Sequence, residues 1–91
     1  MAGVINPIKI KNGDGIDFNN RQTINNNTVY TLGNLKSQTS NAPISSGAAC
    51  VFIRMSSDNY YGYELLIGVD AKLKYGRYTI GANNGDWNNL L

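Results

Sequence analysis

The lack of any means of cross-linking is what most limits how this chain can fold. It has 91 residues, a single cysteine, Cys50, and no histidine. An intrachain disulfide therefore cannot form, and a tetrahedral zinc site of the usual nitrogen and sulfur ligands cannot be assembled. A chain this short buries only about 60–65% of the surface that its unfolded form exposes, which leaves little stability in reserve. We expect no metal or other cofactor, and we expect the domain to gain stability by associating with copies of itself.

Asparagine and glycine indicate short strands joined by tight turns. The sequence contains 14 asparagines and 10 glycines, residues that favour the backbone conformations of turns and form helices poorly. We predict a mainly β fold, a small antiparallel sheet or meander with an N-terminal extended arm. One short helical turn is expected after Asp17, whose side chain would cap it.

The charge of the chain argues against nucleic acid as a partner. Eight Lys and Arg residues against six Asp and Glu residues give a net charge of +2, and the basic residues are scattered. Nucleic-acid binders concentrate their basic residues in a patch or stripe. No apolar stretch approaches the roughly 20 residues that cross a bilayer, so we expect no membrane insertion. The N-terminus lacks the basic-then-apolar order of a secretory signal.

The first 15 residues are expected to form an N-terminal arm or edge strand, and residues 16–91 the body of the domain. Apolar residues alternate with lysines over residues 8–11, which is the period of a half-exposed strand. Pro7 has no N–H to donate to a neighbouring strand, so this strand belongs at an edge. A further strand is predicted over residues 28–32.

Three strands over residues 48–55, 60–67 and 71–80 predict an antiparallel meander. In the third strand the apolar positions change from odd to even numbers after Gly76. A strict period of two cannot keep both sets on one face. A one-residue bulge at Gly76 would restore the alignment, and glycine within a strand is typical of bulges.

The end of the chain is predicted to fold back on the third strand. Asn84-Gly85 is the preferred dipeptide of a type I′ hairpin turn. Such a turn would bring residues 86–91 beside residues 78–81.

The strand over residues 48–55 is apolar on both faces as far as Arg54. It is therefore expected to lie centrally, or to have its second face covered by another subunit. Val51 and Ile53 are candidates for the core or for such an interface. Cys50 lies in the same apolar run and is expected to be buried and inert.

Catalysis finds little support in the sequence. Histidine, the commonest general base, is absent. The carboxylates are Asp14, Asp17, Asp58, Asp70, Asp86 and Glu64. Three of the aspartates fall in predicted turns, where aspartate caps the backbone. We expect no enzymatic activity.

Residues 13–17 match the pattern G-x-G-x-D of calcium-binding β-roll repeats. Those sites need stacked copies of the repeat, and this sequence has one. A plain turn is the prediction for this segment.

Aromatic residues supply the remaining candidates. We expect core or subunit-interface positions for Tyr61, Tyr63, Tyr75 and Trp87. Aromatic rings stack on sugar rings, and Asn or Asp side chains in adjacent loops bond hydroxyl groups. The candidates for ligand contact are Asp58, Asn59, Tyr60, Asn83 and Asn84. Among the charged residues, Arg54 and Arg77 are expected to pair with Glu64 or Asp70.

The order of several short motifs resembles the pyocin-knob type of domain, over about residues 16–91. Asp17-Phe18-Asn19-Asn20 is followed by Thr28-Val29-Tyr30-Thr31 and Asn41-Ala42-Pro43, and later by Tyr75-Gly76-Arg77-Tyr78 and Gly85-Asp86-Trp87. The family's patterns at these places are an Asp-Leu-Asn-like opening, a Gly-x-Tyr strand, an Asn-Ala-Pro segment, a Tyr-x-Arg strand and Gly-x-Trp-x-x-Trp. This chain departs from them in lacking the glycine before Tyr30 and in having Leu90 near the place of the second tryptophan.

Such domains occur in trimeric phage tail fibres and phage-tail-like bacteriocins, so the resemblance implies a knob-like β domain in a virion. It implies a homotrimer that attaches to a bacterial surface glycan or protein, made in the host cytoplasm and carried on the phage particle beside other virion proteins. Two alternatives remain open. One is a purely structural decoration, collar or fibre-joining piece, and the other is a carbohydrate-binding module of a cell-wall enzyme.

Overall fold

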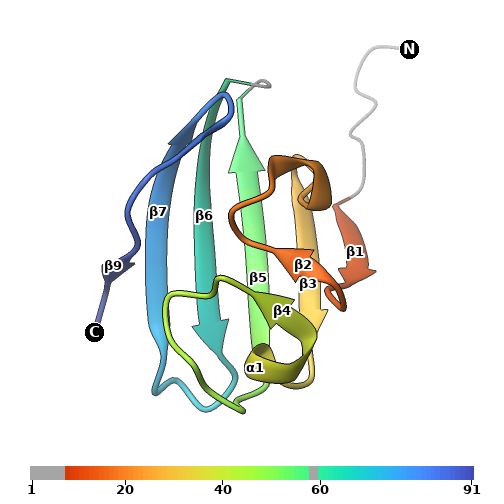
Figure 1. The fold of residues 1–91 in the computed structure, drawn as a ribbon, viewed down its shortest axis with the longest axis vertical. Coiled ribbons are helices and arrows are strands. Elements are labelled where there is room, and N and C mark those ends of the chain that lie inside the picture. The colour runs from red at the N-terminus through yellow and green to blue at the C-terminus, as the bar shows by residue number, and fades with distance from the viewer. Residues whose placement is uncertain (1–7, 58–59) are drawn as a thin grey trace.

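The computed structural model describes residues 8–57 and 60–91 and shows the mainly β fold that the sequence predicts (Figure 1). In chain order its elements are β1 (Lys9–Asn12), β2 (Ile16–Asp17), the 3₁₀ helix η1 (Arg21–Thr23), β3 (Thr28–Leu32), α1 (Leu35–Gln38), β4 (Thr39–Ser40), β5 (Cys50–Ser56), β6 (Tyr61–Gly68), β7 (Lys74–Ile80), β8 (Asn83–Asn84) and β9 (Asn88–Asn89). Neither helix of the described residues has the length or apolar content to cross a membrane.

The main sheet has the strand order β1-β3-β5-β6-β7-β8, and β9 also pairs with β7. From β3 to β7 every neighbouring pair is antiparallel, which confirms the predicted meander. At the edge, β1 runs parallel to β3, so the sheet, which the sequence predicts as antiparallel, is mixed there. Parallel neighbours need a crossover connection, and the segment between β1 and β3 supplies it. The edge position of β1 agrees with the prediction.

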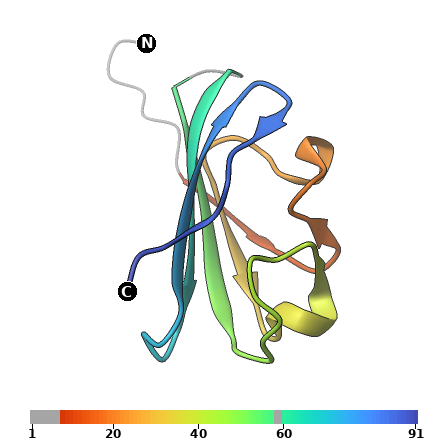
Figure 2. The same cartoon turned by 60° about the vertical axis from the view of Figure 1, so that its left-hand side comes forward.

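Figure 2 shows the sheet nearly edge-on, with β2, η1, α1 and β4 all on one side of it. We call the covered side the inner face and the opposite side the outer face. The core lies between the sheet and these short elements, where Phe18, Phe52 and Leu66 are fully buried. The ring of Phe18 meets that of Phe52 edge-on, with centroids 4.9 Å apart. This geometry is favoured for aromatic pairs and holds the short elements against the sheet.

Asparagine caps both helices. Asn20 accepts a hydrogen bond from the backbone N–H of Gln22 at the start of η1, so the predicted helical turn exists but begins later than expected. Asp17 accepts instead from the N–H of Asn19. The sequence reading missed α1, where Asn34 accepts from the N–H of Ser37. Asparagine is among the preferred N-cap residues.

The tyrosines of β6 lie on the outer face, so of the two positions predicted for Tyr61 and Tyr63 the core is wrong, and the subunit interface stays a prediction. Their exposed fractions are 50% and 37%, whereas Glu64 and Leu66 on the inner face are fully buried. A charged residue is therefore inside and the aromatic residues are outside. Tyr75 is placed as predicted, partly buried and packed against the core.

The expected bulge at Gly76 is absent, because β6 and β7 pair without interruption from Tyr61 opposite Ile80 to Ile67 opposite Lys74. The period of two continues, and the buried positions after Gly76 are Arg77 and Thr79. The change of phase in the sequence thus marks a buried polar cluster on the inner face, with no irregularity of the backbone.

The hairpin after β7 turns at Gly81 and Ala82, three residues before the predicted turn at Asn84-Gly85. Asn83 pairs with Ile80, and Gly81 has a φ of 57°, a left-handed conformation that glycine adopts without strain. The last residues do return beside β7, as expected, but further along it, with β9 opposite Tyr75 and Gly76.

We predict that Gly85→Ala lowers the free energy of unfolding by about 1–3 kcal/mol. A Cβ at Gly85 would overlap the backbone carbonyl of Tyr78, which the sheet holds in place. The control is Gly76→Ala, whose Cβ would meet the hydroxyl end of the Tyr63 side chain, a group that can rotate away. Urea denaturation measures both, and an equal or larger loss in the control would contradict the explanation.

Candidate functional site

Loops from three parts of the chain meet at the end of the sheet where β6 begins, at the top of Figure 1. Hydrogen bonds join them: the N–H of Gly81 donates to the carbonyl of Tyr60 at 2.5 Å, and the amide of Asn84 donates to the carbonyl of Asn19 at 3.2 Å. The side chain of Asn27 accepts from the N–H of Ser56 at the end of β5, at 3.0 Å. We call this region, residues 19–27, 60 and 81–84, the loop end.

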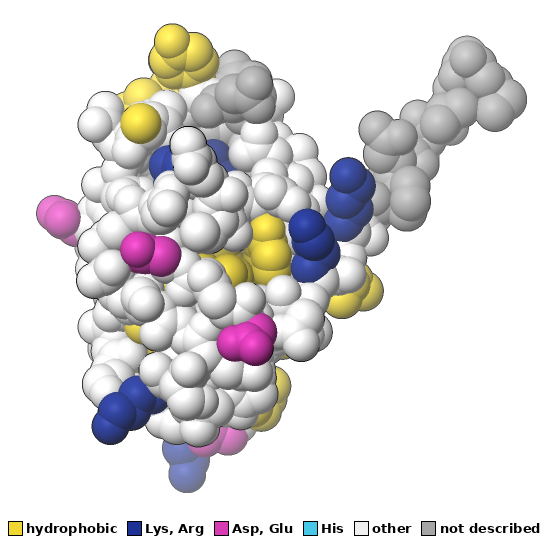
Figure 3. Space-filling view, turned by 45° about the vertical axis from the view of Figure 1, so that its right-hand side comes forward, with side chains coloured by type: hydrophobic (Ala, Val, Ile, Leu, Met, Phe, Trp, Pro, Cys, Tyr) yellow, Lys and Arg dark blue, Asp and Glu magenta, His cyan; other side chains and the backbone are white. Residues whose placement is uncertain are grey.

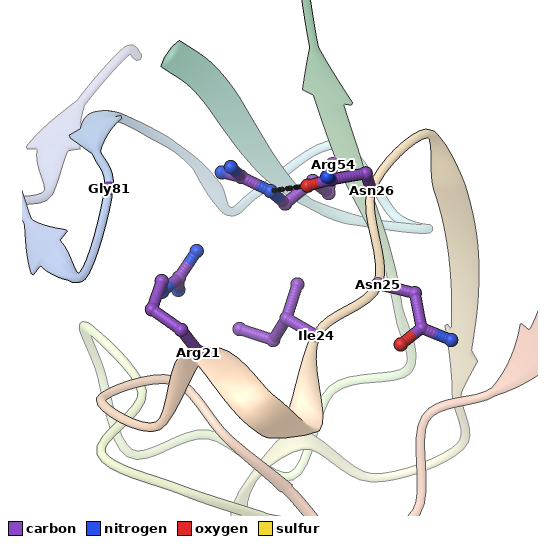
Figure 4. Close-up of a pocket in the computed structure, with 6 residues that line it drawn as sticks. All are labelled: Arg21, Ile24, Asn25, Asn26, Arg54 and Gly81. Carbon is purple, nitrogen blue, oxygen red and sulfur yellow. Dashed lines mark hydrogen bonds between the residues drawn. The ribbon is translucent and has the colours of Figure 1, made fainter. Parts of the chain in front are cut away.

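The loop end contains a pocket of about 290 Å³, lined by Arg21, Ile24, Asn25, Asn26, Arg54 and Gly81. In Figure 4, Arg21 and Ile24 rise from the segment around η1 toward Arg54, which reaches across from β5. Gly81 closes one side. The walls are largely polar, and two guanidinium groups take part in them.

Beneath the pocket, three arginines surround one fully buried carboxylate, that of Glu64. Arg21 approaches it at 2.5 Å, Arg77 at 2.7 Å and Arg54 at 3.1 Å. The predicted pairing of Arg54 and Arg77 with Glu64 is therefore confirmed. Asp70, the alternative partner, instead accepts a hydrogen bond from the N–H of Lys72 in the β6–β7 turn.

A glycine in β6 leaves space for the guanidinium group of Arg54. Arg54 crosses Gly62, where a Cβ would overlap its guanidinium group. It also donates to the hydroxyl of Thr79 at 2.6 Å and to the side chain of Asn26 at 3.1 Å. Buried arginines need several acceptors of this kind to offset the loss of water.

Arg77 ties the cluster to the layer of short elements. It donates to the carbonyl of Phe18, and its guanidinium carbon lies 4.4 Å from the ring centroid of Trp87. Trp87 is partly buried against the core, as the sequence predicted. The stacked cation and the aromatic ring attract one another.

The ionisation of the cluster follows from its neighbours. Burial raises the pKa of Glu64, but the hydrogen bonds and charges of Arg21 and Arg77 outweigh it and hold that pKa below its ordinary value. Burial also lowers the pKa of Arg77, and the carboxylate of Glu64 opposes this shift. Glu64 is therefore ionised at neutral pH.

The structure brings some of the predicted ligand contacts together. Tyr60 is 65% exposed and lies beside Gly81, with Asn83 exposed on the same turn. Asn84 is half-buried through its bond to Asn19. Asp58 and Asn59 lie outside the described residues. Ligand contact by any of these residues stays a prediction.

The outer face forms a second candidate surface, because its apolar side chains are left uncovered by the chain. In register, Ile10 lies next to Val29, Val29 next to Ile53, and Ile53 next to Leu65. The remaining apolar members of this face are Val51, Met55, Tyr61, Tyr63, Ile67, Tyr78 and Ile80. Val51 and Ile53 are half-buried here, so the apolar second face predicted for this strand is present.

The thiol, the glycine-rich turn and the surface charges form no further candidate site among the described residues. Cys50 is buried and free. Residues 13–16 form a turn in which the N–H of Ile16 donates to the carbonyl of Gly13 at 3.2 Å, and β2 follows directly. On the face drawn in Figure 3, acidic and basic side chains are dispersed. The described residues hold no group of three His, Cys, Asp or Glu side chains arranged for a metal ion.

Sequence reasoning missed Arg21, Asn25 and Asn26 as pocket residues. The run of three asparagines reads as low complexity, and Arg21 reads as the end of a helical turn. A signal was present in β7, where Arg77 and Thr79 occupy positions that should face the core. Buried arginine requires an acidic partner, so this pattern points to Glu64 and the groups around it.

No family model matches the chain, and no curated protein matches its sequence. Among solved structures, the chain is similar to the R1 pyocin fiber of P. aeruginosa, in a structure comprising C-terminal residues 323–701. The TM-score is 0.69 at 14% sequence identity, and the match covers 98% of this chain but 23% of that one. The likeness to pyocin fibres is thus confirmed at the level of the fold, and membership of the knob family stays a prediction.

We predict that Glu64→Gln lowers the free energy of unfolding by about 3–5 kcal/mol at neutral pH, because three buried guanidinium groups lose their carboxylate. The pKa of Glu64 is lowered in the folded chain, so its contribution is complete above the unfolded-state value of about 4.3. It is lost as the pH falls through the folded-state pKa.

Urea denaturation from about pH 3 to 7 measures this dependence. The control is Asp14→Asn at an exposed carboxylate. A Glu64→Gln variant as stable as the control would show that the cluster contributes little.

Proposed function

We propose that this chain is a non-enzymatic β module of a phage tail fibre or phage-tail-like particle. In this proposal it assembles as a homotrimer through the outer face and contacts the bacterial surface with the loop end. The observation that carries the proposal is an uncovered apolar sheet face in a fold shared with a region of a pyocin fiber. The module is carried on the particle beside other virion proteins.

The outer face has the composition of an interface. A sheet with one face in water normally shows polar residues there, yet this one presents Tyr63, Tyr78 and Met55, each more than a third exposed. Contiguous apolar surface of this kind marks sites where proteins associate. Aromatic residues and methionine are also enriched at interfaces.

Copies of the same chain are the occupants that fit best. Among the described residues the outer face carries a single ionic side chain, Lys74, near one end of β7, so two such faces meet without repulsion. The chain has no disulfide to stabilise it, and packing these faces would extend its small core. A closed symmetric assembly buries the same surface of every subunit.

Attachment is assigned to the loop end because of where it lies. The outer face is on the side of the sheet, whereas the loops stand at the end of its strands (Figures 1 and 2). Assembly through the side therefore leaves this end accessible. Exposed Tyr60 and Asn83 offer an aromatic ring and an amide there, the groups that contact sugars.

A fibre-joining piece is the second candidate, favoured by the exposed edge of β1. Every residue of this strand is exposed, and β3 pairs with one side of it only. Such an edge accepts a strand from a neighbouring protein.

The trimer is tested with Tyr78→Glu, a change at a residue that is 49% exposed and therefore compatible with the folded chain. We expect the parent protein to show about three times the chain mass of 9.9 kDa by light scattering at micromolar concentration. The variant should be a monomer, because charge is costly in an apolar interface.

The matched control is Val69→Glu, because Val69 is 69% exposed and lies in the β6–β7 turn, beyond the last residue of β6. It should leave the mass unchanged. A parent protein of 9.9 kDa would refute the trimer.

Attachment is tested with Tyr60→Ala, which we expect to weaken binding to susceptible bacterial cells by about tenfold, as the loss of one exposed aromatic contact does. A labelled protein, a panel of strains and a glycan array provide the measurement. Val69→Ala, at the opposite end of the sheet, serves as the control. A correctly assembled protein that binds no strain and no glycan would favour the joining role.

A further inference from the structure

The cluster around Glu64 carries more positive charge than it neutralises. Three guanidinium groups, those of Arg21, Arg54 and Arg77, face one carboxylate, which leaves a formal excess of +2. The whole chain also has a net charge of +2, because its five lysines balance its five aspartates. The excess charge of this one cluster therefore equals the net charge of the whole chain.

Two of the three arginines have different surroundings from the third. Arg77 is fully enclosed by Glu64, the carbonyl of Phe18 and the ring of Trp87. Arg21 and Arg54 instead line the pocket of the loop end. The excess charge is thus placed at the wall of a cavity that opens to solvent.

Arg21 also has unused hydrogen-bonding capacity. Both of its terminal nitrogens donate to Glu64, but its Nε is buried and has no hydrogen-bond partner among the described residues. A buried donor without an acceptor is costly. Guanidinium groups recognise carboxylate and phosphate oxygens by charge and by paired N–H donors.

The rest of the pocket adds neutral groups of suitable chemistry. Asn26 and Gly81 border it, and Asn26 is itself held in place by Arg54 at 3.1 Å. Asn25 borders it through its backbone, because its side chain points away from the pocket (Figure 4). The volume of about 290 Å³ lies just below the range for pockets that bind drug-sized ligands, which begins at roughly 300 Å³. One sugar unit or one phosphate group matches that size.

We infer that the pocket bounded by Arg21, Arg54, Asn25 and Gly81 binds an oxyanion, the carboxylate of an acidic sugar or a phosphate group, borne by a polysaccharide of the bacterial surface. The source of the ligand depends on the proposed attachment role, whereas the site itself depends only on the geometry of the single chain. The anion compensates the excess charge of the cluster, and exposed Tyr60 beside Gly81 is placed to contact the adjoining sugar.

The inference is tested by titrating the ¹⁵N-labelled protein with D-glucuronate, inorganic phosphate and D-glucose, and following the amide signals together with the Nε–H signals of arginine. We expect saturable shifts at Arg21, Asn25 and Gly81 with one or both anions, weakening as salt is added. Glucuronate alone would indicate an acidic sugar, and phosphate alone a phosphorylated polymer. Shifts elsewhere, or equal shifts with glucose, would overturn the inference.

Two variants and one control make the result specific. Arg21→Gln removes a pocket cation, and Asn26→Asp places a carboxylate against Arg54 without altering the contacts of Glu64. Each should weaken anion binding by about tenfold or more. Asn26→Asp keeps the test valid if Arg21→Gln does not fold. Lys72→Gln removes one positive charge from the β6–β7 turn at the opposite end and should leave binding unchanged.

The outcome is separable from that of the proposed function. Anion binding by a protein that is monomeric or attaches to no cell would support the pocket and refute the assembly or attachment role. A trimer that binds cells but neither anion would support the assembly and attachment roles and refute the pocket. Unchanged anion affinity in both pocket variants would also overturn the inference.

Discussion

The buried carboxylate of Glu64 is the interaction on which the rest of this structure depends. It bonds Arg54 and Arg77 from the strands on either side of β6 and Arg21 from the layer of short elements. The same contacts therefore fix the positions of three strands and of the segment packed over them. Because an unpaired buried charge costs several kcal/mol, each of these groups constrains the others. The pocket exists because this arrangement holds Arg21 and Arg54 at its walls.

Much of the framework could be predicted from the sequence, because alternating apolar and polar residues mark strands and glycine-rich segments mark turns, and both patterns are local. The meander of β5, β6 and β7, the edge position of β1 and the burial of Cys50 follow from such patterns. The predictions were wrong where a charged residue is buried because a partner distant in the sequence neutralises it. Tyr61 and Tyr63 are candidates for the core until Glu64, the residue after Tyr63, is known to have arginine partners on the inner face. The apolar positions change from odd to even numbers after Gly76, which suggests a bulge. Only the fold shows that Arg77 lies on the inner face instead.

The candidate site was less predictable than the fold. Tyr60 and Asn83 were identifiable because exposed aromatic and amide groups in turns suggest contact with a ligand. A polar segment supplies the pocket residues Arg21, Asn25 and Asn26, and the contact of Phe18 with Phe52 sets its position over the sheet. That position could not be predicted from a local sequence pattern. The parallel pairing of β1 with β3 could not be predicted either, because it depends on the path of the crossover between the two strands. Sequence reading therefore located the surface of the loop end but not the charged pocket within it.

The single thiol gives the core an internal reporter. Cys50 stands at the start of β5, opposite Leu32 and Gly68, and only 2% of it is exposed. Burial, with a smaller effect from Asp70, raises its pKa, so both access and the reactive thiolate form are restricted while the chain is folded. Cys50 belongs to the core cluster on the inner face, so alkylation at this position requires the layer of short elements to move off the sheet. The rate of labelling measures how often that layer opens, in the isolated chain and in any larger assembly alike.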